Sequence, residues 1–324
     1  IMWIIPKLGL RFPGKTIMEY GGTLLGTKRT ARLNRWLALP IQLLLIAMWL
    51  VMAIIDFRLF GDVLISTVLP ETPIEGTLLV ALISYVMVEL EVVVRFNELM
   101  FPVLLLPIIF ISALSFQKVW VTNLLPVVFP DMLGFLQSSA DLLFALQGFS
   151  IMTVLMAFTQ REHNVKSNIG GVAIPALIFT LLIVASLGMF GYTELQHLTM
   201  PTLELTKATN ITFLILERLD ALFIAVWVVA IFTTAGNLFY TACFSIAQIL
   251  PVRKEDVTRR WVAVGFVSVA FWSALIPENI FEVSEWTDYI GYVGAVAYVL
   301  IILLYVLAVV RGKGKEAARI DGNG

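Results

Sequence analysis

The sequence predicts an all-α polytopic membrane protein. Of its 324 residues, 59% are hydrophobic and 14% are charged, whereas soluble domains have about 45–50% apolar and about 25% charged residues. The mean hydropathy is +0.92. The long apolar runs show no alternation of polarity, which favours spanning helices over the strands of a membrane barrel. We therefore expect one transmembrane domain over residues 1–324.

Eight runs meet or approach the length of a membrane span. A helix needs about 20 mainly apolar residues to cross the roughly 30 Å hydrocarbon layer of a bilayer. We interpret each run as one spanning helix. The runs are 36–57, 77–94, 99–116, 139–159, 171–191, 220–250, 261–276 and 287–310.

The basic residues fall mainly on one side of this predicted arrangement. Eighteen of the 22 lysines and arginines lie before the first span, in alternate connections or after the last span. The other four are Arg58, Lys118, Lys207 and Arg218. Because cytoplasmic loops carry the excess of Lys and Arg, the sequence predicts that both ends of the chain lie in the cytoplasm.

The first residues read as the end of a helix. The letters "IMWII" supply five apolar residues before Pro6 and Lys7. We expect that they are the last turn of a helix whose earlier part is absent, so that the domain is truncated at its N-terminus. A processed or short amphipathic N-terminus is the alternative.

Motifs for hydrolysis, phosphate binding and metal binding are missing from the sequence. Cys243 is the single cysteine, and His163 and His197 fall in connections on opposite sides of the membrane. No phosphate-binding glycine loop, nucleophile elbow or zinc motif occurs. The basic clusters flank spans and therefore indicate contacts with lipid headgroups rather than nucleic acid. The sequence predicts no enzyme, no cofactor and no metal site.

Acidic residues within or near spans are candidates for a functional role. Glu89 and Glu91 lie at the cytoplasmic end of the second run, and Asp56 lies at the outer end of the first. These positions allow each carboxylate to reach water or to pair with Arg95 or Arg58. We expect ordinary ion pairs there rather than a proton relay.

The fourth run carries an interruption. In "FALQGFSIMTVLMAF", residues 144–158, the polar residues Gln147 and Ser150 flank Gly148 near the middle of the span. Glycine weakens a helix and permits unusual torsions, and irregular backbone at membrane depth survives only where it is buried or lines a cavity. An unwound site for an amino acid is one interpretation. Close approach of a neighbouring helix is the other.

A polar stripe in the sixth run supplies a candidate opposing wall. Thr233, Asn237 and Tyr240 stand at i, i+4 and i+7, so they share one helix face. They either line a ligand site or form hydrogen bonds between helices, worth about 0.6 kcal/mol each. Thr233 and Thr234 together are also a weak signal for a sodium site.

Five strings occur in an order and spacing that resembles the spore germination permease family. This family comprises the B subunits of nutrient germinant receptors in endospore-forming bacteria and is related to the amino acid–polyamine–organocation transporters. The resemblance extends over most of the chain, up to about residue 250, and more loosely beyond. The strings are "RFPGKTIMEY" (11–20), "LPETP" (69–73), "RFNELMFPVLL" (95–105), "LQGFS" (146–150) and "LERLDALFIAVW" (216–227).

The resemblance implies a LeuT-type fold of ten helices in a five-plus-five inverted repeat, with helices one and six broken at the substrate site. Residues 36–57 then correspond to helix three, 139–159 to helix six and 220–250 to helix eight, while helix one and most of helix two are absent. The implied ligand residues are Phe144, Gln147, Gly148, Phe149, Ser150, Thr233, Asn237, Tyr240, Met48 and Met52. Related transporters often have an acidic residue where this chain has Ser150, which disfavours an ion-coupled cycle.

The resulting expectation is a membrane subunit that senses a small nutrient, most simply an amino acid, at a midplane pocket. The family implies a larger A subunit and a lipoprotein C subunit as partners, in the spore inner membrane. The alternatives are an amino-acid transporter, and a scaffold or ion and water conduit that binds no nutrient.

Overall fold

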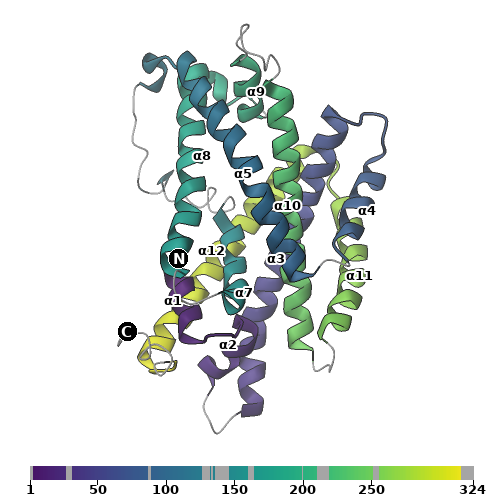
Figure 1. The fold of residues 1–324 in the computed structure, drawn as a ribbon, viewed down its shortest axis with the longest axis vertical. Coiled ribbons are helices and arrows are strands. Elements are labelled where there is room, and N and C mark those ends of the chain that lie inside the picture. The colour runs from purple at the N-terminus through teal and green to yellow at the C-terminus, as the bar shows by residue number, and fades with distance from the viewer. Residues whose placement is uncertain are drawn as a thin grey trace.

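The computed structural model describes residues 3–26, 31–86, 89–125, 132, 134–135, 146–159, 164–198, 200–209, 219–250 and 255–314. Helices account for all the regular secondary structure in these ranges. They pack side by side into an elongated bundle (Figure 1). The predicted all-α class is therefore confirmed for the described part of the chain.

Five helices are long and apolar enough to cross a bilayer. They contain the expected runs 36–57, 99–116, 171–191, 220–250 and 287–310, to within one residue, so a polytopic helical membrane protein is confirmed at this level. The five helices are α3 (Ala31–Thr67), α5 (Leu90–Ser115), α8 (Asn164–Leu195), α10 (Leu219–Ile249) and α12 (Ile280–Val310).

The expected run 77–94 is divided between two helices. Helix α4 (Ile74–Ser84) ends within this run, and Glu89 is the extended N-cap residue of α5, with φ −99° and ψ 158°. A carboxylate is favourable at a helix N-terminus, where unpaired N–H groups and the helix dipole meet it. The negative charge that we expected at the end of one span therefore lies at the start of the next helix.

The two remaining runs form helices that are shorter or less apolar than expected. The described part of run 139–159 contains η4 (Gly148–Ile151), α7 (Met152–Leu155) and η5 (Met156–Phe158), which we call together the helix-six segment. Helix α11 (Glu255–Ala274) covers most of run 261–276, but its first turns are polar. The eight spans and the inverted repeat stay predictions.

The turn "FPGKT" joins the two first helices, α1 (Ile4–Arg11) and α2 (Ile17–Leu25). Gly14 has φ +70°, a left-handed torsion that favours glycine. Thr16 then caps α2, because its backbone N–H donates to Oε2 of Glu19 at 2.8 Å. The Thr16 hydroxyl donates to Oε1 of Gln248 in α10 at 2.6 Å, which ties the turn to the bundle.

Short elements cover one end of the bundle. Helix α9 (Pro201–Ala208) lies there, with η2 (Phe116–Lys118) and η3 (Val121–Leu124) after α5 (Figure 1). The backbone N–H of Trp120 donates to the carbonyl of Gly188 in α8 at 2.9 Å. This contact fastens the connection after α5 to α8.

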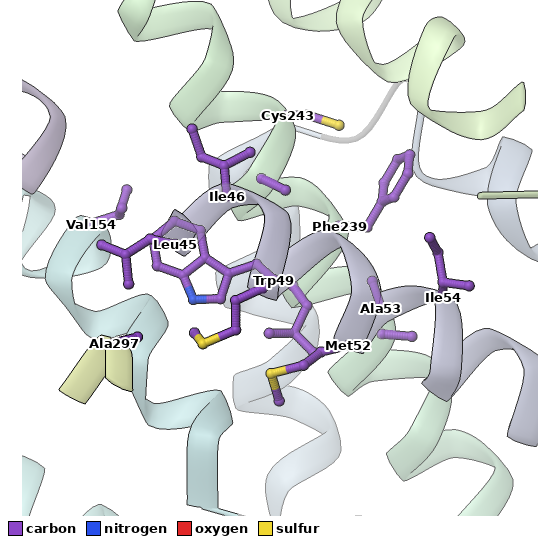
Figure 2. Packing of buried hydrophobic residues seen from close by; sticks show 14 of the residues in the cluster. Leu45, Ile46, Trp49, Met52, Ala53, Ile54, Val154, Phe239, Cys243 and Ala297 are labelled. Carbon is purple, nitrogen blue, oxygen red and sulfur yellow. The ribbon is translucent and has the colours of Figure 1, made fainter. Parts of the chain in front are cut away.

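Helix α3 is the centre of the bundle. It packs against α2, α4, α10, α11 and α12, and 56% of its most apolar window is buried, compared with 17% for α5. Its side chains Trp49 and Met52 enter the core together with Phe239 of α10 (Figure 2). The apolar surface of α5 is left for lipid, as expected for a helix at the periphery of a membrane bundle.

The chain's first helices and the end of α12 lie together at one end of the bundle (Figure 1). Arg11 donates to the carbonyls of Ala308 and Lys313, at 3.3 and 3.2 Å, and Arg311 donates to Leu24 O at 2.8 Å. Burial and the neighbouring Arg311 charge lower the pKa of Lys313 below its ordinary value. The basic residues thus gather as the charge pattern predicts, while the cytoplasmic orientation stays a prediction.

Candidate functional site

The helix-six segment is helical at Gly148, in a tightened form. Gln147 has helical torsions, and residues 148–151 form a 3₁₀ turn rather than an unwound break. A mid-helix 3₁₀ stretch commonly marks a hinge or local strain. Apart from its chain neighbours and the backbone of its own helix, no described atom lies within 4 Å of the place that a Cβ at Gly148 would occupy. Close packing of a described helix on this glycine is therefore not the reason for it, and the described residues leave space beside it.

Ser150 joins the segment to the central helix. Trp49 of α3 is fully buried, and its Nε1 donates to Oγ of Ser150 at 2.7 Å. Because the hydrogen bond is enclosed, either partner alone would be a costly buried polar group. This contact brings the predicted helix-six residues against the predicted helix-three residues, since Met48 and Met52 flank Trp49.

Gln147 has one satisfied and one unsatisfied end. Its Nε2 donates to the carbonyls of Ile290 and Gly291 in α12, at 3.2 and 2.8 Å. Its Oε1 is buried and has no hydrogen-bond partner among the described residues. Reversing the amide would set Oε1 against two carbonyl oxygens, so the assignment follows from the contacts. Oε1 is an acceptor that a donor on a ligand could satisfy.

Helix α12 is shaped to receive this side chain. A Cβ at Gly294 would overlap the Gln147 amide, so only glycine leaves room for it. One turn further along α12, the Tyr298 hydroxyl donates to the carbonyl of Leu146 at 2.9 Å. The start of the helix-six segment is thus held on α12 by side-chain contacts at two levels.

The two methionines predicted at the site, Met48 and Met52, contribute apolar surface and no polar contact with the described residues. Met48 is 1% exposed and Met52 is 3% exposed, and both belong to the central core. Figure 2 shows Met52 beside Trp49. Phe149 is half-buried and packs against the same core. Phe144 lies outside the described residues.

The threonines of α10 bond within their own helix. The hydroxyls of Thr233 and Thr234 both donate to the carbonyl of Ala230, at 2.8 and 2.9 Å. Thr233 is buried and Thr234 is exposed, so the two hydroxyls do not face one cavity together. Within the described residues, no three His, Cys, Asp or Glu side chains are grouped as metal ligands.

Asn237 is engaged with another helix. Its Nδ2 donates to Oδ1 of Asn97 in α5 at 3.2 Å, and Asn97 Nδ2 donates back at 2.7 Å. The reciprocal pair matches the interhelical alternative that the sequence left open. It joins α10 to α5, which the sequence did not predict as a wall of the site.

The ring of Tyr240 lies beside the buried guanidinium of Arg259. Its ring stacks on Phe244 with centroids 6.1 Å apart, and the guanidinium of Arg259 lies 5.0 Å from its centroid. Arg259 is only 2% exposed, and its Nε has no hydrogen-bond partner among the described residues. The Tyr240 face therefore supports a cation–π contact with α11.

Glu89 and Glu91 both form ion pairs, but only Glu91 pairs with the expected Arg95. Glu91 pairs with Arg95 at 2.7 Å, whereas Glu89 pairs with Arg260 of α11 at 3.3 Å. All four side chains are exposed, so each pair adds little stability. A shallow hollow beside residues 90–98 is lined by Glu91, Arg95 and Glu98 among others, and the residues lining it include none of the predicted ligand residues.

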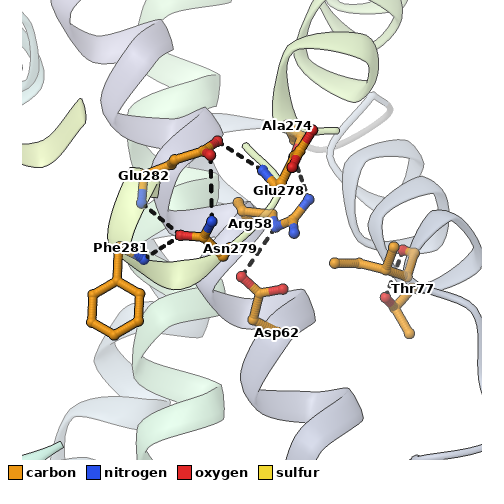
Figure 3. Close-up of polar contacts among 9 residues, drawn as sticks. Arg58, Asp62, Thr77, Ala274, Glu278, Asn279, Phe281 and Glu282 are labelled. Atoms are coloured by element: carbon orange, nitrogen blue, oxygen red, sulfur yellow. Dashed lines mark hydrogen bonds and ion pairs between the residues drawn. The ribbon is translucent and has the colours of Figure 1, made fainter. Parts of the chain in front are cut away.

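Asp56 behaves differently from the expectation. Arg58 donates to Asp62 Oδ2 at 3.0 Å and to the carbonyl of Ala274 at 2.9 Å (Figure 3). Arg58 is thus committed to Asp62, one helical turn further along α3, instead of Asp56. Helix α3 also continues to Thr67, so Asp56 does not mark its outer end. The sequence missed this because the i,i+4 partner lies beyond the apolar run.

The structure therefore brings together the helix-six residues Gln147 and Ser150 with the neighbourhood of Met48 and Met52. Of the stripe on α10, Asn237 is directed toward α5 and Tyr240 toward α11, while the Thr233 hydroxyl bonds within its own helix. Three contact residues were not predicted individually from the sequence, namely Trp49, Asn97 and Tyr298. Trp49 could have been suspected as a large ring with a hydrogen-bond donor in the middle of a span.

Comparison with known proteins agrees with the motif resemblance. A family described as "Spore germination protein" matches residues 1–283. Spore germination protein YndE of Bacillus subtilis (strain 168) is 22% identical over 280 residues, covering 85% of this chain and 74% of that protein. Spore germination protein GerLB of Bacillus cereus is 22% identical over 295 residues, covering 89% and 75%.

A further relative, Spore germination protein A2 of Bacillus subtilis (strain 168), is 22% identical over 261 residues, covering 79% of this chain and 70% of that protein. The family match includes α3 and the helix-six segment, which build the candidate site together with α12, and it ends near the start of α12. This membrane chain therefore belongs to the spore germination permease family, whose members are described as spore germination proteins.

Proposed function

We propose that the protein is the membrane subunit of a nutrient-germinant receptor and that it binds a small nutrient, an amino acid, beside the helix-six segment. The observation that carries this proposal is that Oε1 of the fully buried Gln147 has no hydrogen-bond partner among the described residues, which also leave space beside Gly148. A buried acceptor without a partner costs about 1–3 kcal/mol. A ligand donor would remove that cost.

The pocket would lie between the helix-six segment, α3 and α12. Ser150 is fixed by Trp49, and Gln147 is fixed by two carbonyls of α12, so the acceptor is pre-positioned. Met48 and Met52 add apolar wall of the kind that suits a small aliphatic side chain. Phe144, Phe149, Thr233, Asn237 and Tyr240 remain proposed neighbours, of which Asn237 would act through Asn97 and α5.

Binding would signal by shifting a conformational equilibrium. A ligand moves such an equilibrium only by its different affinity for the two states. The 3₁₀ stretch at residues 148–151 is a place where the segment can change its winding without breaking a long helix. The change would reach the A and C subunits of the receptor, in the spore inner membrane, through the helices that hold the segment.

The proposal is tested by ligand-dependent thermal stability of the purified protein in lipid nanodiscs. Candidate nutrients are the protein amino acids, glucose and inosine. A ligand that binds only the folded state at 100 times its Kd stabilises it by about 2.7 kcal/mol. We expect at least one amino acid to raise the melting temperature.

A matched pair of variants tests whether the ligand-dependent stabilisation arises at Gly148. Gly148→Leu puts a side chain into the open space and should abolish the shift while the protein stays folded. Gly265→Leu adds the same side chain at an exposed, unobstructed position of α11 and should keep it. If no nutrient stabilises the wild-type protein, the pocket does not exist and a scaffold or conduit role is favoured. Accumulation of the bound amino acid in proteoliposomes would instead identify a transporter.

A further inference from the structure

The C-terminal end of α12 gathers three basic side chains, Arg11, Arg311 and Lys313, which we call the basic cluster. They lie where α1, α2 and the end of α12 meet (Figure 1). None of the three forms an ion pair with a carboxylate of the described residues. Glu19, the acid of α2, accepts instead from the backbone N–H of Thr16. The positive charge of the cluster is therefore not neutralised by a described acid.

Backbone carbonyl groups hold the basic cluster in place. Nη1 of Arg311 donates to the carbonyl of Leu24 at 2.8 Å, and Nζ of Lys313 donates to the same carbonyl at 3.4 Å. Nη1 of Arg11 donates to the carbonyls of Ala308 and Lys313, at 3.3 and 3.2 Å. The cations thus bind the C-terminal ends of α2 and α12, where basic side chains are favourable.

Helix capping does not account for all of this charge. A helix C-terminus is equivalent to about half a negative charge, so the ends of α2 and α12 offset about one of the three positive charges. Burial lowers the pKa of Lys313, and so does the neighbouring charge of Arg311. A net positive charge of about two is left for an anion from outside the described residues.

Both guanidinium groups keep one edge unused. Arg11 and Arg311 make these contacts through Nη1, and no described residue accepts a hydrogen bond from Nε or Nη2 of either side chain. The Nε–Nη2 edge presents two parallel donors, the arrangement that binds a phosphate or a carboxylate. Because Nη1 is anchored, this edge is already positioned.

The chain after α12 is held closely against α1. Gly312 and Gly314 have φ +62° and +78°, torsions that favour glycine. A Cβ at Gly314 would overlap the backbone carbonyl of Arg11. The basic cluster is therefore a formed feature of the fold rather than a set of independent surface side chains.

Aromatic and apolar side chains place the basic cluster at the edge of the hydrocarbon layer. The Tyr305 ring lies 5.9 Å from the guanidinium carbon of Arg11 and 6.2 Å from the ring of Trp3, and Trp and Tyr are enriched at membrane interfaces. The last turn of α12 exposes Val309 and Val310, at 41% and 76%. Positive charge beside exposed apolar side chains suits an anionic amphiphile better than a free anion.

We propose that the basic cluster binds the phosphate of an anionic phospholipid, whose acyl chains lie against the last turn of α12. The phosphate oxygens would accept from a Nε–Nη2 edge, and the negative charge of the lipid would compensate the excess positive charge. Bound lipid would tie α1, α2 and α12 together. The site is separate from the helix-six segment, so the inference does not depend on the proposed nutrient binding.

Thermal unfolding of the full chain in nanodiscs tests the inference. Nanodiscs of phosphatidylcholine alone are compared with nanodiscs in which the fraction of phosphatidylglycerol is raised in steps. We expect the melting temperature to rise and then to saturate at a low fraction, because a ligand that binds the folded state stabilises it in proportion to its occupancy. Native mass spectrometry in detergent should show phosphatidylglycerol retained on the protein.

Two variants that conserve charge separate a site from diffuse attraction. Arg311→Lys keeps the positive charge and a donor for Leu24 but removes the guanidinium edge. We expect the phosphatidylglycerol fraction at half-saturation to rise about tenfold. Arg95→Lys is the control, since Arg95 is exposed, is predicted on the same side of the membrane and pairs with Glu91. It should behave like wild type.

Three results would overturn the inference. Equal melting temperatures at every phosphatidylglycerol fraction would show that no anionic lipid is bound. A half-saturation point of Arg311→Lys equal to that of wild type would show attraction by charge alone. Stabilisation by inorganic phosphate or glycerol phosphate, with no further effect of phosphatidylglycerol, would identify a free-phosphate site. If Arg311→Lys is already destabilised in phosphatidylcholine, the lipid-dependent shift and the retained lipid of Arg11→Lys decide by the same criteria.

Discussion

A single buried hydrogen bond joins Trp49 to Ser150 and thereby sets the helix-six segment against the central helix. Polar contacts of this kind carry specificity in a membrane bundle, because apolar side chains pack on lipid almost as well as on each other. The residue types were visible in the sequence, but which serine meets which ring was not. Two substitutions at this scale test the arrangement.

Trp49→Phe keeps most of the buried ring and removes the donor. The hydroxyl of Ser150 then loses its partner in an enclosed site, so we expect a loss of about 1 kcal/mol in the free energy of unfolding. Thermal or denaturant unfolding in detergent measures it. Trp272→Phe is the control, since Trp272 is 69% exposed and should change stability little. Equal losses in both variants would mean that the hydrogen bond contributes nothing.

Gly294→Ala should expel the Gln147 side chain from its place on α12. The added methyl group overlaps the amide, and overpacking of this kind costs about 1–3 kcal/mol. We also expect the variant to lose nutrient binding, because the acceptor is displaced. Gly265→Ala, at an open position, should keep both stability and binding. Unchanged melting of Gly294→Ala would contradict the packing described here.

At the scale of elements, the turn between α1 and α2 explains one family motif in physical terms. In "FPGKT", Gly14 supplies the left-handed torsion and Thr16 the cap of α2. Phe12 then stacks on Tyr20 with ring centroids 4.7 Å apart. The motif thus forms the turn between α1 and α2 and anchors the start of α2 to α10.

Gly14→Ala tests the turn. Apart from its chain neighbours, no described atom lies within 4 Å of the added Cβ, so we attribute any loss of stability to the torsion of +70°. We expect about 1–2 kcal/mol. Gly76→Ala, in an exposed helical position with equal space, should not destabilise the protein. A Gly14→Ala protein as stable as wild type would show that the turn can adopt another torsion.

The helix-six segment shows where element prediction reached its limit. Gly148 and its polar neighbours correctly marked an unusual stretch, but the residue types did not distinguish an unwound break from a 3₁₀ turn. The difference between the two depends on the contacts of Gln147 and Ser150 with α12 and α3. Those contacts join residues more than 100 positions apart in the sequence.

At the scale of the whole molecule, the basic residues at one end of the bundle predict its orientation. Lys313 and Glu278 belong to opposite ends of α12 and its flanking turns. Single cysteines at Lys313→Cys and Glu278→Cys, in a Cys243→Ser background, can be labelled with a membrane-impermeant maleimide. In right-side-out vesicles, whose lumen corresponds to the cytoplasm, we expect labelling at position 278 before permeabilisation and at position 313 only afterwards. The opposite pattern would invert the topology.

The sequence by itself determined the membrane environment, the helical class and the family. Composition required a membrane, the apolar runs located five long helices, and the motifs indicated the spore germination permeases, since all of these depend on local composition and order. Run 77–94 was the misjudged element, because hydropathy does not detect a helix that restarts at Glu89.

Only the tertiary structure decided the partners of the buried polar groups. It paired Asn237 with Asn97, gave Arg58 to Asp62, and left Asp56 and Gln147 Oε1 without partners among the described residues. A side chain's type fixes what it can donate or accept, but its partner depends on how helices distant in the chain pack. The candidate ligand site is a consequence of that packing.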